Sequence, residues 1–446
     1  MKTFKSIAAA VAVLCAAGCW AAAPAAQQDQ PFVLSLSKDD GPALGSSPRA
    51  SAELPPSLTL PEYLSLVRTQ HPTLRAMPLR QRMEQADVQT ASTWANPSLH
   101  YSSKFDEREL GLEQPLPIFG QIGMRTEAAR LAAASGQAER AAQVQEILGE
   151  AAQRFAQLLL EQQKLAAKQQ AMAQLDQAVK IVQGQIQLGG RSRYDGARVE
   201  LQRAQMQVQL EQQQAQTLAA RAGLAQLIAL PNWSPEAVGS LLPAKAAAPA
   251  QEPSFDAMWQ QAQTRLAPLQ AAHARVVQAE QFTRQQAREA LPTPTVGVTR
   301  VRGRQESYGY NQVGISIELP LFDRKQGPIE RARLEYAQAQ LEEDAAQQQA
   351  RQQLQQALRQ RNLLRQSLAN FESRGLSQLA PLRQMAQDAY RLNQSSILEW
   401  LDAMESVATH EQEYLDLTLQ AWQAQWQLDA ARGRMPLADA VAGTDL

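Results

Sequence analysis

Apolar residues recur at alternating spacings of three and four over residues 121–188, a stretch that contains no proline. Only Gln162 and Gln169 interrupt the clearest part of this series. Its members are Val144, Leu148, Ala151, Phe155, Leu158, Leu165, Met172, Leu175, Val179, Val182 and Ile186. Such a heptad pattern predicts a long helix that packs side by side with other helices. At 1.5 Å per residue the helix would be roughly 100 Å long, far longer than a compact domain needs.

Shorter elements flank this helix. A capping box at Thr59–Glu62, with Pro61 in the first turn, begins an earlier helix. Alternating apolar and polar residues then predict two strands, at about 97–105 and 109–115. The long helix breaks at Gly189 and Gly190, and a return helix is expected over 196–230.

The same order of elements recurs in the second half of the chain. There the pattern predicts strands at about 294–302 and 312–319, a long helix at about 324–392 and a return helix at 397–432. Two segments align at one fixed offset, namely 111–119 with 314–322 and 127–131 with 330–334. This internal duplication is strong evidence for two repeats, which we place at 57–233 and 254–434, joined by a Pro- and Ala-rich linker at 234–253.

The chain ends do not follow the repeats. Lys2 and Lys5 precede a short apolar run, which is typical of a secretory signal peptide. Cleavage after Ala25 would give a signal of residues 1–25, whereas cleavage before Cys19 would give residues 1–18 and a lipidated lipoprotein. Residues 26–56 are expected to form a flexible arm and residues 435–446 a tail. The other cysteine, Cys15, also lies in the signal, so the mature chain would have no disulfide.

Charge and composition exclude several classes of function. The formal net charge is −1 and no basic run is present, which argues against nucleic acid as a partner. No glycine cluster has the spacing of a phosphate-binding loop. The histidines have no metal-ligand spacing; they are His71, His100, His273 and His410. We therefore predict a protein that is not an enzyme and that needs no cofactor or metal.

Four predicted strands are too few to close a barrel, which needs about eight. Each has about the 10 residues that span a bilayer as a tilted strand, yet an open sheet edge in lipid would leave backbone groups unpaired. Three chains with four strands each would supply twelve and close by symmetry. Tyr101, Tyr308 and Tyr310 would suit an aromatic girdle. The alternative is a pair of soluble hairpins packed on helices.

Acidic residues gather where the second helical hairpin turns. Glu399 and Asp402 are three residues apart and share a helix face, and Asp195 follows the first break. Threefold symmetry would turn each into a carboxylate ring, which disfavours anions and can hold cations. Alternatively, they are solvated acids near a helix N-terminus. Pro381, inside the second long helix, is expected to bend it toward the axis of the tube.

Several motifs resemble the TolC-like outer-membrane efflux protein family. They are LTLPE at 58–62, ANPSL at 95–99, QPLP at 114–117, ELPLFD at 318–323 and YRLNQSSILEWLD at 390–402. Within that family, residues 319–327 are most similar to the CzcC-type members, which serve heavy-metal export. The resemblance implies a mainly α fold with membrane β: a trimeric twelve-stranded outer-membrane barrel that continues as a periplasmic α-helical coiled-coil tube.

The resemblance also implies a function and partners. The protein would be the channel component of a tripartite efflux system, a passive duct from periplasm to exterior, with heavy-metal cations as a candidate cargo. Its partners would be a periplasmic adaptor (membrane fusion protein) and an inner-membrane pump of the RND type. The alternative is a periplasmic coiled-coil adaptor or structural spacer, which would need only one helical hairpin and a compact β domain.

Family positions carry over to two groups of residues at the far end of the helices. The periplasmic gate falls on Asp195, Tyr390, Glu399 and Asp402. The adaptor-docking tips fall on Gly189, Gly190, Arg191, Ser192, Asn393, Gln394, Ser395 and Ser396. Some family members carry a basic residue where this chain has Ser395, so the bonding network of the closed gate is expected to differ here.

Overall fold

A computed structural model describes residues 55–241, 253–303, 308–392 and 394–434. All of them belong to one compact unit, Leu54–Leu446. The expected signal peptide with Cys19, residues 26–54 of the expected arm, residues 242–252 of the linker, Asn393 and the tail lie outside the described residues.

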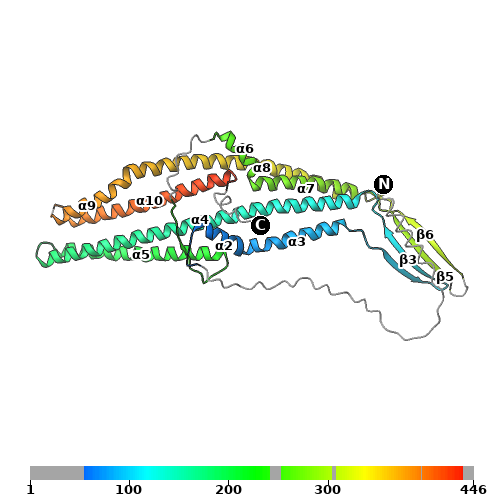
Figure 1. Ribbon diagram of the computed structural model, residues 1–446, viewed down its shortest axis with the longest axis horizontal. Helices are drawn as coiled ribbons and strands as arrows, with labels where there is room; N and C mark the ends of the chain where they lie inside the picture. Colours follow the sequence, from blue (N-terminus) through cyan, green and yellow to red (C-terminus); the bar gives the residue numbers. More distant parts are fainter. Residues whose placement is uncertain (1–54, 242–252, 304–307, 393, 435–446) are drawn as a thin grey trace, which may run out of the picture. The chain divides into compact units, whose positions relative to one another are not determined.

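The helices and strands of the two repeats follow one another in the same order (Figure 1). The first repeat contains β1 (Ser57–Leu58), α2 (Leu60–Gln70), α3 (Pro72–Ser92), β2 (Ser98–Ser103), β3 (Glu107–Pro115), α4 (Gln121–Gln187) and α5 (Arg193–Leu227), and β4 (Glu236–Ala237) follows in the linker and pairs with β1. The second contains α6 (Phe255–Arg265), α7 (Ala267–Glu289), β5 (Thr295–Gly303), β6 (Gly309–Ser316), α8 (Gln326–Phe371), a π-helical turn (Glu372–Leu376), α9 (Ser377–Arg391) and α10 (Ile397–Ala431).

Two expected helices have different bounds in the structure. The return helix expected over 196–230 is α5, and it begins at Arg193 because Ser192 Oγ accepts a hydrogen bond from the backbone N–H of Asp195 over 3.2 Å. The long helix expected over 324–392 is divided into α8 and α9 by the π-helical turn. In this turn Ser373 Oγ donates to the carbonyl oxygen of Ala369 over 2.9 Å, a bond that competes with the regular helical ladder.

The second hairpin also differs from its expected bounds. The strand expected over 312–319 is β6, which ends at Ser316, so residues 317–319 lie beyond the sheet. Its partner β5 begins at Thr295, directly after Pro294. Because proline has no N–H to donate, only the carbonyl oxygen of Pro294 continues the pairing, accepting from the N–H of Leu116 over 2.7 Å.

The sheet joins the two repeats. Its order is β2-β3-β5-β6, and every neighbouring pair is antiparallel. The central pair unites the repeats, since β3 comes from the first and β5 from the second, with Gly111 opposite Thr299. Strands β2 and β6 are the two edges. In Figure 1 this sheet lies at one end of the helices, and the α4–α5 and α9–α10 turns lie at the other.

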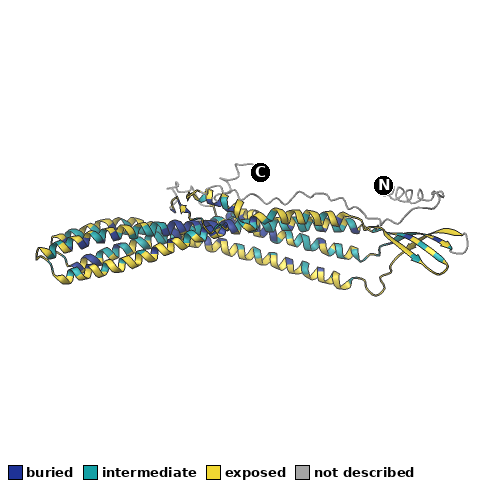
Figure 2. Cartoon of the chain, turned by 90° about the horizontal axis from the view of Figure 1, so that it is seen from below, coloured by how far each residue is buried: buried dark blue, intermediate teal, exposed yellow. Residues whose placement is uncertain are grey.

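The main core surrounds the middle of α4, where buried residues are concentrated in Figure 2. Tyr63 of α2 is fully buried there, and its ring stacks on Phe155 with 5.9 Å between ring centroids. The Tyr63 hydroxyl donates to the carbonyl oxygen of Leu224 in α5 over 3.1 Å. Each such buried side chain contributes roughly 1.5 to 3 kcal/mol through removal of apolar surface from water. This core therefore fixes α2 and α5 on α4.

None of the helices in the described ranges is long and apolar enough to cross a membrane.

Candidate functional site

The first turn of the candidate site connects α4 to α5. Gly189 has φ 75°, a left-handed conformation that glycine adopts without a Cβ clash. The N–H of Gly190 donates to the carbonyl oxygen of Gln185 over 2.9 Å, which closes the end of α4. At Gly196 a Cβ would lie 2.8 Å from Cδ1 of Ile186, so only glycine allows this approach of α5 to α4 without a shift.

The second turn connects α9 to α10 and contains a complete capping box. The backbone N–H of Ser396 donates to Oε2 of Glu399 over 2.8 Å, and the N–H of Glu399 donates to Ser396 Oγ over 3.3 Å. The N–H of Gln394 donates to the carbonyl oxygen of Ala389 over 2.8 Å. The carboxylate of Glu399 is therefore engaged in starting α10, a role that typically contributes about 1 kcal/mol.

A second hydrophobic core packs these two turns against each other. Its buried members come from α4, α5, α9 and α10. They are Leu175, Ala178, Val179, Val182, Val199, Tyr390, Ile397, Trp400 and Leu401. Tyr390 is fully buried, and its ring stacks on Trp400 with 4.5 Å between centroids and 22° between planes. The two hairpins of one chain are thus packed together at their tips.

Arg191 bridges the two hairpins. Its guanidinium carbon lies 4.5 Å from the centroid of the Tyr390 ring, which is cation–π geometry. Its Nη2 also donates to the backbone carbonyl oxygen of Tyr390 over 3.3 Å. The α4–α5 turn of the first repeat is thereby held on the end of α9 in the second.

The hydroxyl of Tyr390 is buried and has no hydrogen-bond partner among the described residues. Burial raises the pKa of this phenol, the positive charge of Arg191 opposes the rise, and the negative charge of Asp195 adds to it. A buried hydroxyl without a partner costs about 1 to 3 kcal/mol. The side chain is therefore held by packing and by Arg191 although its polar atom is unsatisfied.

The structure brings together only part of the expected gate. Tyr390 and Asp195 lie in the same tip, and Asp195 is half-buried. Glu399 and Asp402 are exposed, and no described residue forms a hydrogen bond or ion pair with the Asp402 carboxylate. Of the expected docking residues, Ser192, Gln394 and Ser396 are exposed, whereas the Ser395 hydroxyl is buried without a described partner.

The sequence did not predict that Arg191 and Trp400 contact Tyr390. Arg191 was expected only as a docking residue, and Trp400 was not singled out. No spacing rule relates Arg191 to Tyr390, because they lie 199 positions apart. The duplication could have indicated that the two breaks lie together, since equivalent turns of two repeats occupy equivalent ends of their helices.

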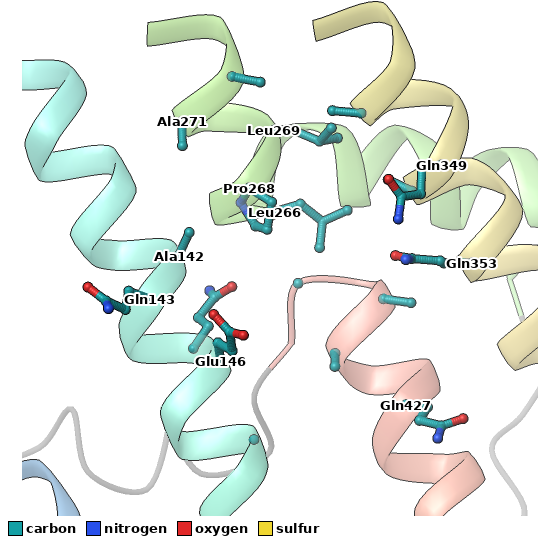
Figure 3. Close-up of a pocket in the computed structure, with 18 of the residues that line it drawn as sticks. Ala142, Gln143, Glu146, Leu266, Pro268, Leu269, Ala271, Gln349, Gln353 and Gln427 are labelled. Carbon is teal, nitrogen blue, oxygen red and sulfur yellow. The ribbon is translucent and has the colours of Figure 1, made fainter. Parts of the chain in front are cut away.

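A cleft of about 1280 Å³ lies between α4, α7, α8 and α10, away from the tips (Figure 3). Its polar lining is dominated by glutamines such as Gln143, Gln349, Gln353 and Gln427, next to small and apolar side chains at the α6–α7 break. Ionisable side chains line it as well, among them Glu146 and Glu342, and Arg275 forms an ion pair with Glu139 at 2.6 Å. Within the described residues, no group of three or more His, Cys, Asp or Glu side chains could hold a metal ion.

Comparison with known proteins agrees with this architecture. Residues 258–434 match the sequence model of the family described as outer membrane efflux protein. Among curated proteins, no sequence is significantly similar to this chain.

Three solved structures share the fold over 84% of this chain. CusC is 18% identical, with a TM-score of 0.71 and 92% of its own chain covered. The outer membrane protein VceC of Vibrio cholerae is 17% identical, with a TM-score of 0.67 and 96% covered. The outer membrane channel CmeC of Campylobacter jejuni is 13% identical, with a TM-score of 0.70 and 85% covered.

The family match and the shared fold confirm the resemblance that the sequence motifs indicated. They confirm the mainly α class with a β region, and the family that matches residues 258–434 is one of outer membrane efflux proteins. The similarity to CzcC-type members stays a prediction. The second half of the chain thus matches the outer membrane efflux protein family over residues 258–434, and the chain shares the fold of CusC and of the outer membrane channel CmeC over 84% of its length.

Proposed function

We propose that three copies of this chain join their sheets into a twelve-stranded barrel and their helices into a periplasmic tube, forming a passive export duct. The observation that carries this proposal is the sheet itself. Its edge strands β2 and β6 have no further strand partner in the described parts of the chain, and its apolar face is exposed, with Leu99, Val313 and Ile315 about 70% accessible. Joining edges between copies would pair the backbone groups that lipid cannot satisfy.

A soluble spacer does not account for this face. In water the exposed Leu99, Leu110, Val313 and Ile315 would form an apolar surface of a kind that soluble monomers rarely carry. In a bilayer, lipid acyl chains would cover this apolar surface and remove the cost of exposing it to water. The sheet therefore favours the channel over the coiled-coil adaptor or spacer.

We further propose that the tip described above is the periplasmic gate. Arg191 and Tyr390 would hold the two hairpins of each chain together in the closed state, with Asp195 beside them. The exposed carboxylates of Glu399 and Asp402 would form acidic rings around the threefold axis. Such rings favour cations over anions at the entrance.

The exposed turns suit a docking role. Four large apolar side chains protrude there, with exposed fractions of 88% for Leu188, 61% for Tyr194, 67% for Leu392 and 44% for Leu398. Apolar side chains surrounded by polar ones are typical of protein interfaces. We propose that a periplasmic adaptor binds these turns and connects the duct to an inner-membrane pump of the RND type. Heavy-metal cations are our proposed cargo, supported by the CzcC-like segment 319–327 and the acidic tip.

Planar-bilayer recording of the purified full-length protein tests the duct. We expect discrete conductance steps, together with a particle mass in detergent that corresponds to three chains. A protein that stays monomeric in detergent-free buffer and produces no conductance would contradict the proposal.

A further inference from the structure

The antiparallel register assigns every strand residue to one of two faces of the sheet, because directly opposed residues point to the same side. One face, here the outer face, carries a band of apolar side chains. They are Leu99, Tyr101, Leu110, Leu112, Val296, Val298, Val313 and Ile315. The opposite face, here the inner face, carries Ser98, His100, Glu109, Glu113, Thr299 and Gln312.

The outer face changes character toward the hairpin loops. Arg108 of β3 is directly opposite Arg302 of β5, and Arg300 is opposite Leu110. All three arginines are exposed. Arg302 is six residues along β5 from Val296, roughly 20 Å at 3.4 Å per residue, so Arg302 and Arg108 lie beyond the apolar band. Arg300 lies at the edge of that band, level with Leu110. We call Arg108, Arg300 and Arg302 the arginine band.

The arginine band has no acidic partner in the described part of the chain. Nη1 of Arg300 donates to Oδ1 of Asn311 over 2.8 Å, whereas the side chains of Arg108 and Arg302 form no hydrogen bond or ion pair with a described residue. Like charges directly opposite each other on neighbouring strands destabilise a sheet. The arrangement therefore favours an anion between Arg108 and Arg302.

The nearby glutamates cannot supply that anion. Glu107 and Glu109 belong to the inner face, on the other side of the sheet. Glu107 accepts a hydrogen bond from the Tyr308 hydroxyl over 3.0 Å, and Glu109 forms an ion pair with Lys104 at 2.8 Å. These two glutamates are therefore engaged away from the arginine band.

We propose that the arginine band binds the phosphate groups of an anionic lipid of the outer leaflet, of the lipid A class. This inference rests on the proposed function, because the helices are then periplasmic and the hairpin end of the sheet reaches the outer leaflet. Acyl chains would cover the apolar band while the phosphates reach the guanidinium groups. Arginine matches phosphate with two parallel hydrogen bonds, which gives this contact strength and geometric specificity. Symmetry would repeat the site three times.

Native mass spectrometry of the full-length protein, reconstituted with lipid A in excess and then purified in detergent, tests the site. We expect Arg108→Gln/Arg302→Gln to retain lipid A at least about tenfold less than the wild type, since two charge-assisted contacts are lost per site. The matched control is Arg331→Gln/Arg333→Gln, which removes two exposed arginines from α8 outside the sheet and should retain as much as the wild type. Equal retention by the sheet variant and the wild type would overturn the proposal.

Two further measurements distinguish a lipid site from a folding defect and from a site for free anions. Arg108→Lys/Arg302→Lys preserves the charge, and should assemble even if the glutamine variant does not, yet it should still retain several-fold less lipid because lysine lacks the forked geometry. Millimolar inorganic phosphate should not displace the lipid from the wild type; displacement would mean a site for free anions and would overturn the lipid assignment.

Conductance of the wild type separates this inference from the proposed function. Conducting trimers that retain no lipid A would overturn the arginine site alone, whereas a protein that neither trimerises nor conducts would contradict the proposed duct.

Discussion

The guanidinium carbon of Arg191 lies 4.5 Å from the ring centroid of Tyr390, and the same side chain donates to the Tyr390 carbonyl oxygen. This contact joins the turn of the first helical hairpin to the end of the second. The Tyr390 ring also stacks on Trp400 within the buried core of the tip. The ring is therefore fixed by two contacts, one with the Arg191 guanidinium and one with the Trp400 indole. Separation of the two hairpins would break this contact together with the hydrophobic core around Tyr390.

Replacing Arg191 should therefore favour opening. Cation–π contacts contribute about 0.5 to 2 kcal/mol, so Arg191→Gln should raise the open probability in planar bilayers roughly twofold to thirtyfold. The control is Arg193→Gln, which removes an exposed arginine of the same turn. Indistinguishable open probabilities for the two variants would show that the Arg191–Tyr390 contact does not hold the gate.

Removing the Tyr390 hydroxyl should not destabilise the protein, because that group is buried without a described partner. We expect Tyr390→Phe to change the free energy of unfolding by between 0 and about +1 kcal/mol, measured by denaturant titration. Tyr63→Phe should instead lose about 0.5 to 1.5 kcal/mol, since Tyr63 donates to Leu224. A loss above 1 kcal/mol for Tyr390→Phe would mean that the hydroxyl has a stabilising partner.

The stability difference between the wild type and Tyr390→Phe should depend on pH. Burial raises the folded-state pKa of Tyr390 above the ordinary 10.0. Its neutral form is therefore favoured on folding, so the stability it contributes is full below pH 10 and is lost as the pH rises from there through the folded pKa. The wild type should lose stability relative to Tyr390→Phe over that alkaline range and not below it. A constant difference from pH 7 to 11 would contradict the assignment.

Neutralising the acidic tip should weaken cation block. We expect Glu399→Gln/Asp402→Asn to reduce the affinity for a divalent blocker applied from the periplasmic side about fivefold or more, since each charge contributes about 1 kcal/mol at 4 Å in water. Glutamine at 399 can still close the capping box, so α10 should keep its start. Glu330→Gln/Glu335→Gln on α8 is the control, and unchanged block in the tip variant would remove the gate assignment.

Docking at the turns can be tested by crosslinking. Ser192 and Gln394 are exposed, one on each turn, and neither contributes to the Arg191–Tyr390 contact. With a cysteine-reactive crosslinker, cysteines introduced at these positions should crosslink to the adaptor of the same efflux system. A cysteine at Gln340 on α8, remote from the turns, should not. Crosslinking from position 340 alone would place the adaptor elsewhere.

Local pattern determined the elements of this protein. The heptad series over 121–188, the two glycines after it and the alternation in the hairpins act through helix periodicity, backbone freedom and strand pleat, which are properties of neighbouring residues. The duplication then gave the second half the same elements. The π-helical turn within the second long helix was not predicted, because the apolar periodicity of the sequence carries no signal for it.

Only the tertiary structure decided which of these elements meet. The pairing of β3 with β5 joins the repeats into one sheet and thereby places Arg108 opposite Arg302. The packing of the two hairpins brings Arg191 onto Tyr390. Such contacts depend on burial and geometry between residues about 200 positions apart, and the sequence carries no local signal for them because their energy exists only once the chain has folded.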